Sequence, residues 1–72
     1  MLYIQIRNTG NKGWWYATSD GSGTRKLIHA AATAPADKDK LLTSVQKMAP
    51  ENPELDFRVV SREGDRLTQV WP

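Results

Sequence analysis

The chain has 72 residues, a net charge of +2 and no cysteine, which limits it to one small domain without disulfides or cysteine-ligated metal. No apolar run approaches the roughly 20 residues that a membrane helix requires, and the N-terminus lacks the basic lead and apolar segment of a signal peptide. We therefore expect a single domain over residues 1–72, an intact cytosolic polypeptide stabilised by apolar packing of large side chains such as Phe57 and Trp71.

The first third of the chain predicts three strands. Residues 2–7 alternate between aliphatic and polar side chains, which indicates a half-buried strand. The glycines and asparagines of residues 8–13 suit a tight reversal, and a second strand is expected over about 14–18. An Asp-Gly turn at residues 20–23 favours a hairpin, with a third strand over about 24–30.

A single helix is expected over residues 36–48. Pro35 suits the first turn of a helix, where its missing N–H costs nothing, and Pro50 and Pro53 are expected to end the helix. One apolar stripe recurs at helical spacing and can cover the face of a small sheet; it consists of Leu41, Leu42, Val45, Met48 and Ala49.

The last third of the chain predicts two more strands. Residues 55–60 alternate, residues 62–65 form a turn, and residues 67–71 form the final strand. The whole pattern is ββ(β)αββ. We therefore predict an α+β fold, in which a small antiparallel sheet of four to five strands carries one helix packed across one face.

The residue types of enzymes and metal sites are scarce. His29 is the single histidine, there is no cysteine for a Cys/His pair, and nothing in the spacing favours a Ser-His-Asp arrangement. The glycines of residues 21–26 precede a predicted strand, whereas a phosphate-binding loop leads into a helix. We therefore expect no enzyme activity, no cofactor and no metal.

Aromatic and basic residues gather in the predicted hairpin. Residues 1–30 hold four basic residues against Asp20, a net charge of +3, which suggests an anionic partner. Trp14 and Trp15 must point to opposite faces of a strand, so at least one is expected in the core and the other is a candidate contact. Together with the sheet face described next, the candidate binding residues are Arg7, Lys12, Trp14, Trp15, Tyr16, Arg25, Lys26 and Arg58.

A second cluster is expected on the sheet face opposite the helix. Alternation places Tyr3, Gln5 and Arg7 of the first strand on that face, together with Arg58 of the fourth strand. A solvated sheet face is the simpler explanation of such polar residues, and a binding surface is the alternative.

Two family resemblances follow from this order of elements. The aromatic strand, Asp-Gly turn, basic strand and helix of residues 2–49 resemble the arm-site DNA-binding domains of tyrosine-type phage integrases, which implies a sheet that enters the major groove. The whole chain is similar in size and pattern to small phage-encoded inhibitors of the anti-CRISPR kind, which implies binding to a bacterial effector complex. No motif is shared residue by residue with either family.

Three functions are therefore open. The leading hypothesis is a non-enzymatic inhibitor of phage or mobile-element type, acting in the bacterial cytoplasm on a protein or ribonucleoprotein complex that handles nucleic acid. The second is direct DNA binding through the aromatic and basic hairpin. The third is a structural domain that oligomerises through a sheet edge.

Overall fold

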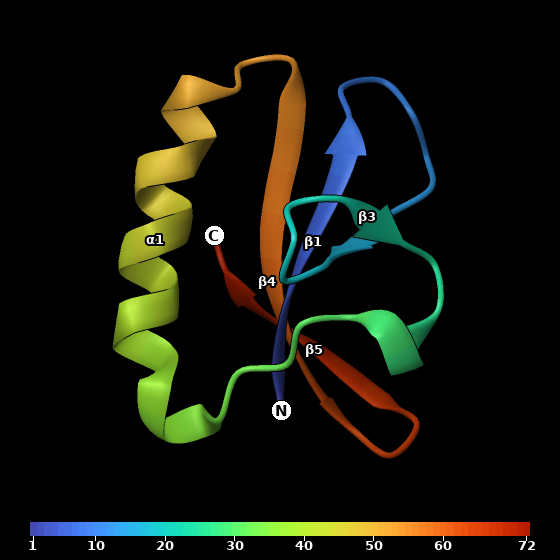
Figure 1. Cartoon of the computed structure of the whole chain (residues 1–72), viewed down its shortest axis with the longest axis vertical. Coiled ribbons are helices and arrows are strands. Elements are labelled where there is room, and N and C mark those ends of the chain that lie inside the picture. The colour runs from blue at the N-terminus through green and yellow to red at the C-terminus, as the bar shows by residue number, and fades with distance from the viewer.

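Five antiparallel strands form one open sheet in the order β3-β2-β1-β4-β5, and a single α-helix packs against it (Figure 1). The computed structural model covers residues 1–72, and the α+β prediction with one helix is confirmed. The elements, in chain order, are β1 (Leu2–Asn8), β2 (Trp15–Ala17), β3 (Gly23–Thr24), the 3-10 turns η1 (Leu27–His29) and η2 (Pro35–Asp37), α1 (Lys38–Glu51), β4 (Leu55–Glu63) and β5 (Arg66–Trp71).

The long pair of β1 and β4 is the centre of the sheet. It runs without a break from Leu2 opposite Ser61 to Asn8 opposite Leu55. Since directly opposed residues share a face, the aliphatic residues of β1 lie on the same side as Val59 and face α1.

The helix begins where the sequence indicates and ends later than predicted. Pro35 opens η2, which leads directly into α1, and α1 continues through Pro50 to Glu51. Pro50 cannot donate to the carbonyl four residues earlier, but only Glu51 follows it in α1, so the disturbance is confined to the end of the helix. Asn52 then closes the helix, because its side-chain amide donates to the carbonyl of Met48 at 3.0 Å and its N–H donates to that of Ala49 at 3.2 Å.

The prediction of a third strand over residues 24–30 is wrong. β3 contains only Gly23–Thr24, and it pairs with β2 at two positions. The chain then bends into η1, and residues 31–33 return to the sheet instead: the N–H of Ala31 donates to Ala17, and Thr33 exchanges two hydrogen bonds with Leu2. The segment after η1 therefore forms hydrogen bonds with the end of β2 and the start of β1. No long ribbon projects from the sheet.

The predicted turn at residues 20–23 is present and is held by its own side chains. The hydroxyl of Thr18 donates to the carboxylate of Asp20, and the N–H and hydroxyl of Ser22 donate to the same oxygen at 3.0 and 2.7 Å. Gly21 has a φ of 86°, which a residue with a side chain rarely adopts. These hydrogen bonds lower the pKa of Asp20 from 3.8 to about 2, with that from Thr18 the largest cause.

We predict that this turn loosens in acid. Since the folded-state pKa of Asp20 is depressed, its carboxylate stabilises the fold above about pH 3.8, and that contribution disappears as the pH falls towards 2. The difference in urea midpoint between the natural chain and Asp20→Ala should therefore shrink over this range. A carboxyl-carbon NMR titration should give a midpoint near 2 for Asp20, moving upward in Ser22→Ala; an unchanged midpoint in that variant would contradict the assignment.

The core is aliphatic, so the expectation that a tryptophan of the hairpin lies in the core is wrong. Leu2, Val45 and Val59 are at most 4% exposed, whereas Trp15 is 42% exposed and Trp14 is half-buried. Three aliphatic side chains of α1 pack around this cluster together with Ile4, Val70 and Trp71; they are Leu41, Leu42 and Met48. Val45 and Val59 fill the space between the helix and the sheet. The large rings of β2 therefore lie outside the core, on the two surfaces of the sheet.

Val59→Ala is expected to lower the free energy of unfolding by about 2 kcal/mol, because it removes two buried methyl groups and leaves a cavity. That is a large share of the roughly 4–11 kcal/mol that a domain of this size has. Ile28→Ala is the matched control, because Ile28 is 85% exposed, and it should change the free energy by less than about 0.5 kcal/mol. Urea unfolding followed by far-UV circular dichroism measures both; equal effects would contradict the core assignment.

Candidate binding site

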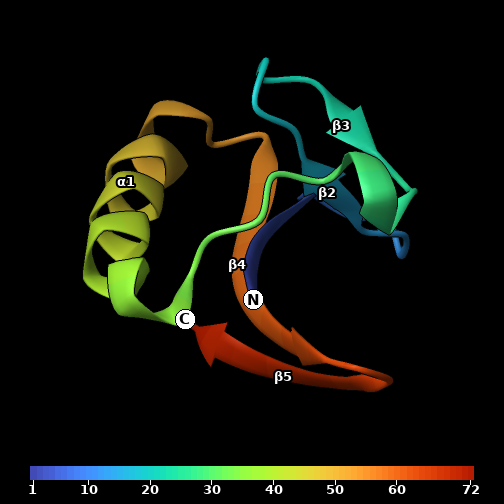
Figure 2. The same cartoon turned by 60° about the horizontal axis from the view of Figure 1, so that its bottom comes forward.

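The sheet face that α1 leaves uncovered is the best candidate for a binding surface, and we call it the open face. Figure 2 shows β2 and β3 on the side of the β1–β4 pair that is away from the helix, whereas β5 begins on that side and runs back towards α1, where the chain ends. Val60 and Gln5 point to this side, yet they are only 1% and 5% exposed. The floor of the open face is therefore covered by its own neighbouring side chains and has almost no contact with solvent.

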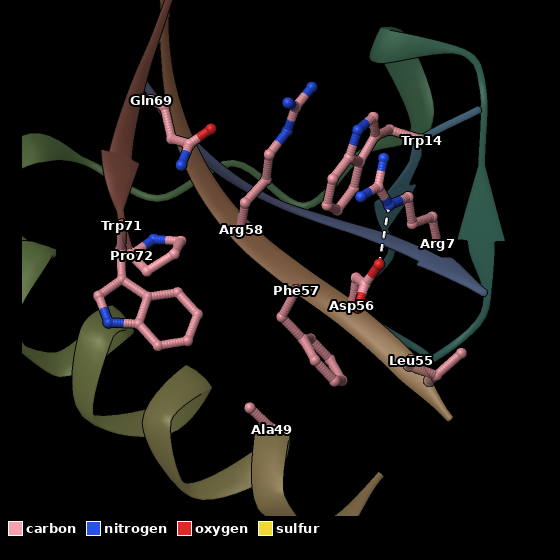
Figure 3. A pocket seen from close by; sticks show the side chains of 10 residues that line it. All are labelled: Arg7, Trp14, Ala49, Leu55, Asp56, Phe57, Arg58, Gln69, Trp71 and Pro72. Atoms are coloured by element: carbon pink, nitrogen blue, oxygen red, sulfur yellow. Dashed lines mark hydrogen bonds and ion pairs between the residues drawn. The ribbon is translucent and has the colours of Figure 1, made fainter. Parts of the chain in front are cut away.

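An arginine–tryptophan stack lies at the centre of the open face. Trp14 lies between Arg7 of β1 and Arg58 of β4 in Figure 3, with the guanidinium carbons 4.4 and 4.2 Å from the indole centroid. Each cation–π contact is worth about 0.5–1 kcal/mol at an exposed site and about 2 kcal/mol when desolvated. The two guanidinium groups carry like charges and repel each other. The electron-rich indole ring between them offsets this repulsion.

The two arginines differ in how their charge is compensated. The Nε of Arg7 forms an ion pair with Asp56 at 2.9 Å, while the Nε of Arg58 donates to the neutral side chain of Gln5. Desolvation by burial lowers the pKa of Arg58, and repulsion by Arg7 lowers it further. A guanidinium remains protonated at any physiological pH, so Arg58 is a cation without an acidic partner, available to an anion.

Two tyrosines extend the open face along β1 and β2. Tyr3 and Tyr16 meet edge to face, with their centroids 5.4 Å apart and their planes inclined at 69°. Tyr16 is paired with Gln5, which in turn accepts the hydrogen bond from Arg58. Aromatic rings and arginine planes therefore adjoin one another across three strands of the sheet.

A second tryptophan and arginine lie on the opposite side of β2. Trp15 is paired with Ile6, so it shares the helix side of the sheet, but it lies where α1 does not cover it. The guanidinium carbon of Arg25 is 4.5 Å from its ring centroid, and a Cβ atom at position 23, where the chain has Gly23, would lie 3.7 Å from the ring. The predicted opposition of Trp14 and Trp15 is confirmed.

The structure thus divides the predicted site residues into three groups. Arg7, Trp14, Tyr16 and Arg58 come together on the open face, while Trp15 and Arg25 form a separate pair on the other face. The third group consists of Lys12 and Lys26, which are exposed in the loops on either side of the hairpin.

Sequence reasoning missed the residues beside the stack that come from the end of the chain. Asp56 neutralises Arg7, and Gln69, Trp71 and Pro72 of the C-terminal segment line a hollow next to Arg58 (Figure 3). The alternation of β4 places Asp56 on the same face as Arg58, but only the register of β1 against β4 brings it opposite Arg7. No local signal in the sequence gives that register.

The side chains of this site are aromatic rings, guanidinium planes and a cation without an acidic partner, which are the groups that planar and anionic ligands require. No three His, Asp or Glu side chains are grouped so that they could hold a metal ion. Neither α1 nor the 3-10 turns are long and apolar enough to cross a membrane.

No protein-family model, curated protein or solved structure matches this chain.

Proposed function

We propose that this chain is a non-enzymatic binding protein that holds single-stranded nucleic acid on its open face. The observation that supports this proposal is the arginine–tryptophan stack beside the Tyr3–Tyr16 pair. Proteins that bind single strands place bases on aromatic rings or guanidinium planes of an exposed sheet and neutralise the phosphates with cations. Arg58, which lacks an acidic partner, is the natural phosphate contact.

A single strand fits this surface better than duplex DNA does. A ribbon that reads the major groove must project from the protein, whereas β2 and β3 pair at only two positions and β2 is itself paired with β1. The rings of the open face lie across β1 and β2, where unstacked bases could reach them. The sheet face, rather than a hairpin inserted into a groove, would therefore contact the nucleic acid.

The test is titration of the protein into a fluorescent 12-nucleotide oligothymidylate, followed by anisotropy at several salt concentrations. The logarithm of the binding constant should fall linearly with the logarithm of salt concentration, by about 0.7 for each phosphate neutralised. A duplex of equal length should bind more weakly. Absence of binding at low salt, or tighter binding of the duplex, would contradict the proposal.

An inhibitor of a bacterial nucleic-acid-handling complex is the second candidate. Arg58 has no acidic partner within the protein, and it can pair with a carboxylate on the surface of another protein as well as with a phosphate. Such an inhibitor would bind an acidic surface of its target, because the open face is cationic and a nucleic-acid channel is cationic as well. A pulldown from bacterial lysate should then recover one defined multi-subunit complex in competition with oligothymidylate; recovery of no complex from several hosts would count against this function.

A further inference from the structure

One side of β4 is uncovered over its first four residues. β5 pairs with β4 only from Glu63 back to Val59, so the segment Leu55–Arg58 has β1 on one side and no strand on the other. A hollow with a volume of about 490 Å³ lies here (Figure 3). That volume is within the range of about 300–1,000 Å³ that ligand pockets occupy.

The backbone of this segment has hydrogen-bonding groups directed into the uncovered side. Glu54 accepts a hydrogen bond from Thr9, and Arg62 donates one to Met1, so the even-numbered positions of β4 bond towards β1. Since N–H and C=O groups alternate in direction along an antiparallel strand, those of Phe57 point away from β1. Phe57 therefore presents one donor and one acceptor at a free sheet edge.

The side chains around this edge are apolar on one side of the sheet and cationic on the other. Figure 3 shows Phe57 pointing towards Ala49 of α1, with the ring of Trp71 beside them. Arg58 and Gln69 lie on the other side of the β4 ribbon. A strand added here would therefore meet an apolar surface and a free positive charge at alternate positions.

We propose that this edge binds an extended peptide of a partner protein as an added antiparallel strand, with an apolar residue opposite Phe57 and an acidic residue opposite Arg58. Strand addition satisfies the free backbone groups, while pockets for alternate side chains select the sequence. Charge complementarity selects the acid, because Asp56 is neutralised by Arg7 whereas Arg58 has no acidic partner. In the antiparallel direction the acidic residue immediately precedes the apolar one, and four residues span about 13 Å.

The probe is the tetrapeptide acetyl-Glu-Val-Thr-Val-amide, titrated into the ¹⁵N-labelled chain. The amide resonance of Phe57 should shift saturably downfield, and its hydrogen exchange should slow, because it gains a hydrogen bond. The same peptide with an N-methyl group on its first valine cannot donate to Phe57 and should lose both effects. Exchanging the glutamate for lysine should weaken binding about fivefold, and the original peptide should lose about two- to fivefold in affinity with Arg58→Gln.

Three outcomes would overturn the proposal: no change at the Phe57 amide, equal binding of the N-methylated peptide, or protection of Phe57 that rises with protein concentration alone, which would indicate pairing between two copies. Failure of peptide binding can be distinguished from failure of oligothymidylate binding. Both ligands use Arg58 and should compete, but only the peptide depends on the backbone of Phe57, so its failure leaves nucleic-acid binding by the open face untouched.

Discussion

Arg58→Gln is expected to weaken binding of oligothymidylate at least about tenfold. The guanidinium of Arg58 lies 4.2 Å from the ring of Trp14 and has no acidic partner within the protein, so a phosphate of the bound oligonucleotide would be its counter-ion. Hydrogen bonds to a charged group contribute about 1.5–3 kcal/mol, which corresponds to at least about a tenfold change in affinity. The slope of the salt dependence should fall by about 0.7, because one phosphate contact is lost.

The chain supplies its own control for this variant. Arg25→Gln removes the same charge from a guanidinium that also covers a tryptophan, at 4.5 Å from Trp15, but on the other face of the sheet. It should change the affinity less than about twofold. Fluorescence anisotropy at one low salt concentration compares the two variants, after circular dichroism has verified that both are folded. Equal losses would mean that net charge, rather than the open face, attracts the oligonucleotide.

The faces of the sheet could be predicted from the sequence, because they follow from local geometry. Alternation in residues 2–7 and 55–60 places Tyr3, Gln5 and Arg58 on one side, and the structure confirms that they share the open face. Period-2 alternation is a property of any extended strand and needs no knowledge of its neighbours. The apolar stripe of the helix was predictable for the same reason.

The contacts across the sheet could not be predicted, because they depend on which distant segments become neighbours. Residues 24–30 can alternate as a strand, yet hydrogen bonds from Ala31 to Ala17 and between Thr33 and Leu2 give those edge positions to the following segment. One tryptophan of the hairpin is expected from the sequence to lie in the core, but the core is filled by valines and leucine, and of the tryptophans only Trp71 packs against it. Tertiary pairing outweighed local propensity in both cases.

Trp14→Ala is expected to weaken oligothymidylate binding about tenfold without removing any charge. The ring holds the guanidiniums of Arg7 and Arg58 in place, and fixing a long side chain on binding costs about 0.5–1.5 kcal/mol for each residue. Two freed arginines therefore cost about 1–3 kcal/mol in affinity. The free energy of unfolding should also be about 2 kcal/mol lower in this variant, because two cation–π contacts and part of the buried indole surface are lost.

The salt dependence separates this positioning role from a purely electrostatic one. In Trp14→Ala both arginines keep their charge, so the slope against salt should stay as in the natural chain while the affinity falls; in Arg58→Gln the slope and the affinity fall together. Trp14→Phe, which keeps an aromatic face, should recover most of the affinity. Trp15→Ala changes the other face and should leave the binding constant within about twofold. If Trp15→Ala weakened binding as much as Trp14→Ala, the contact would belong to the helix side of the hairpin, where Arg25 covers the exposed ring.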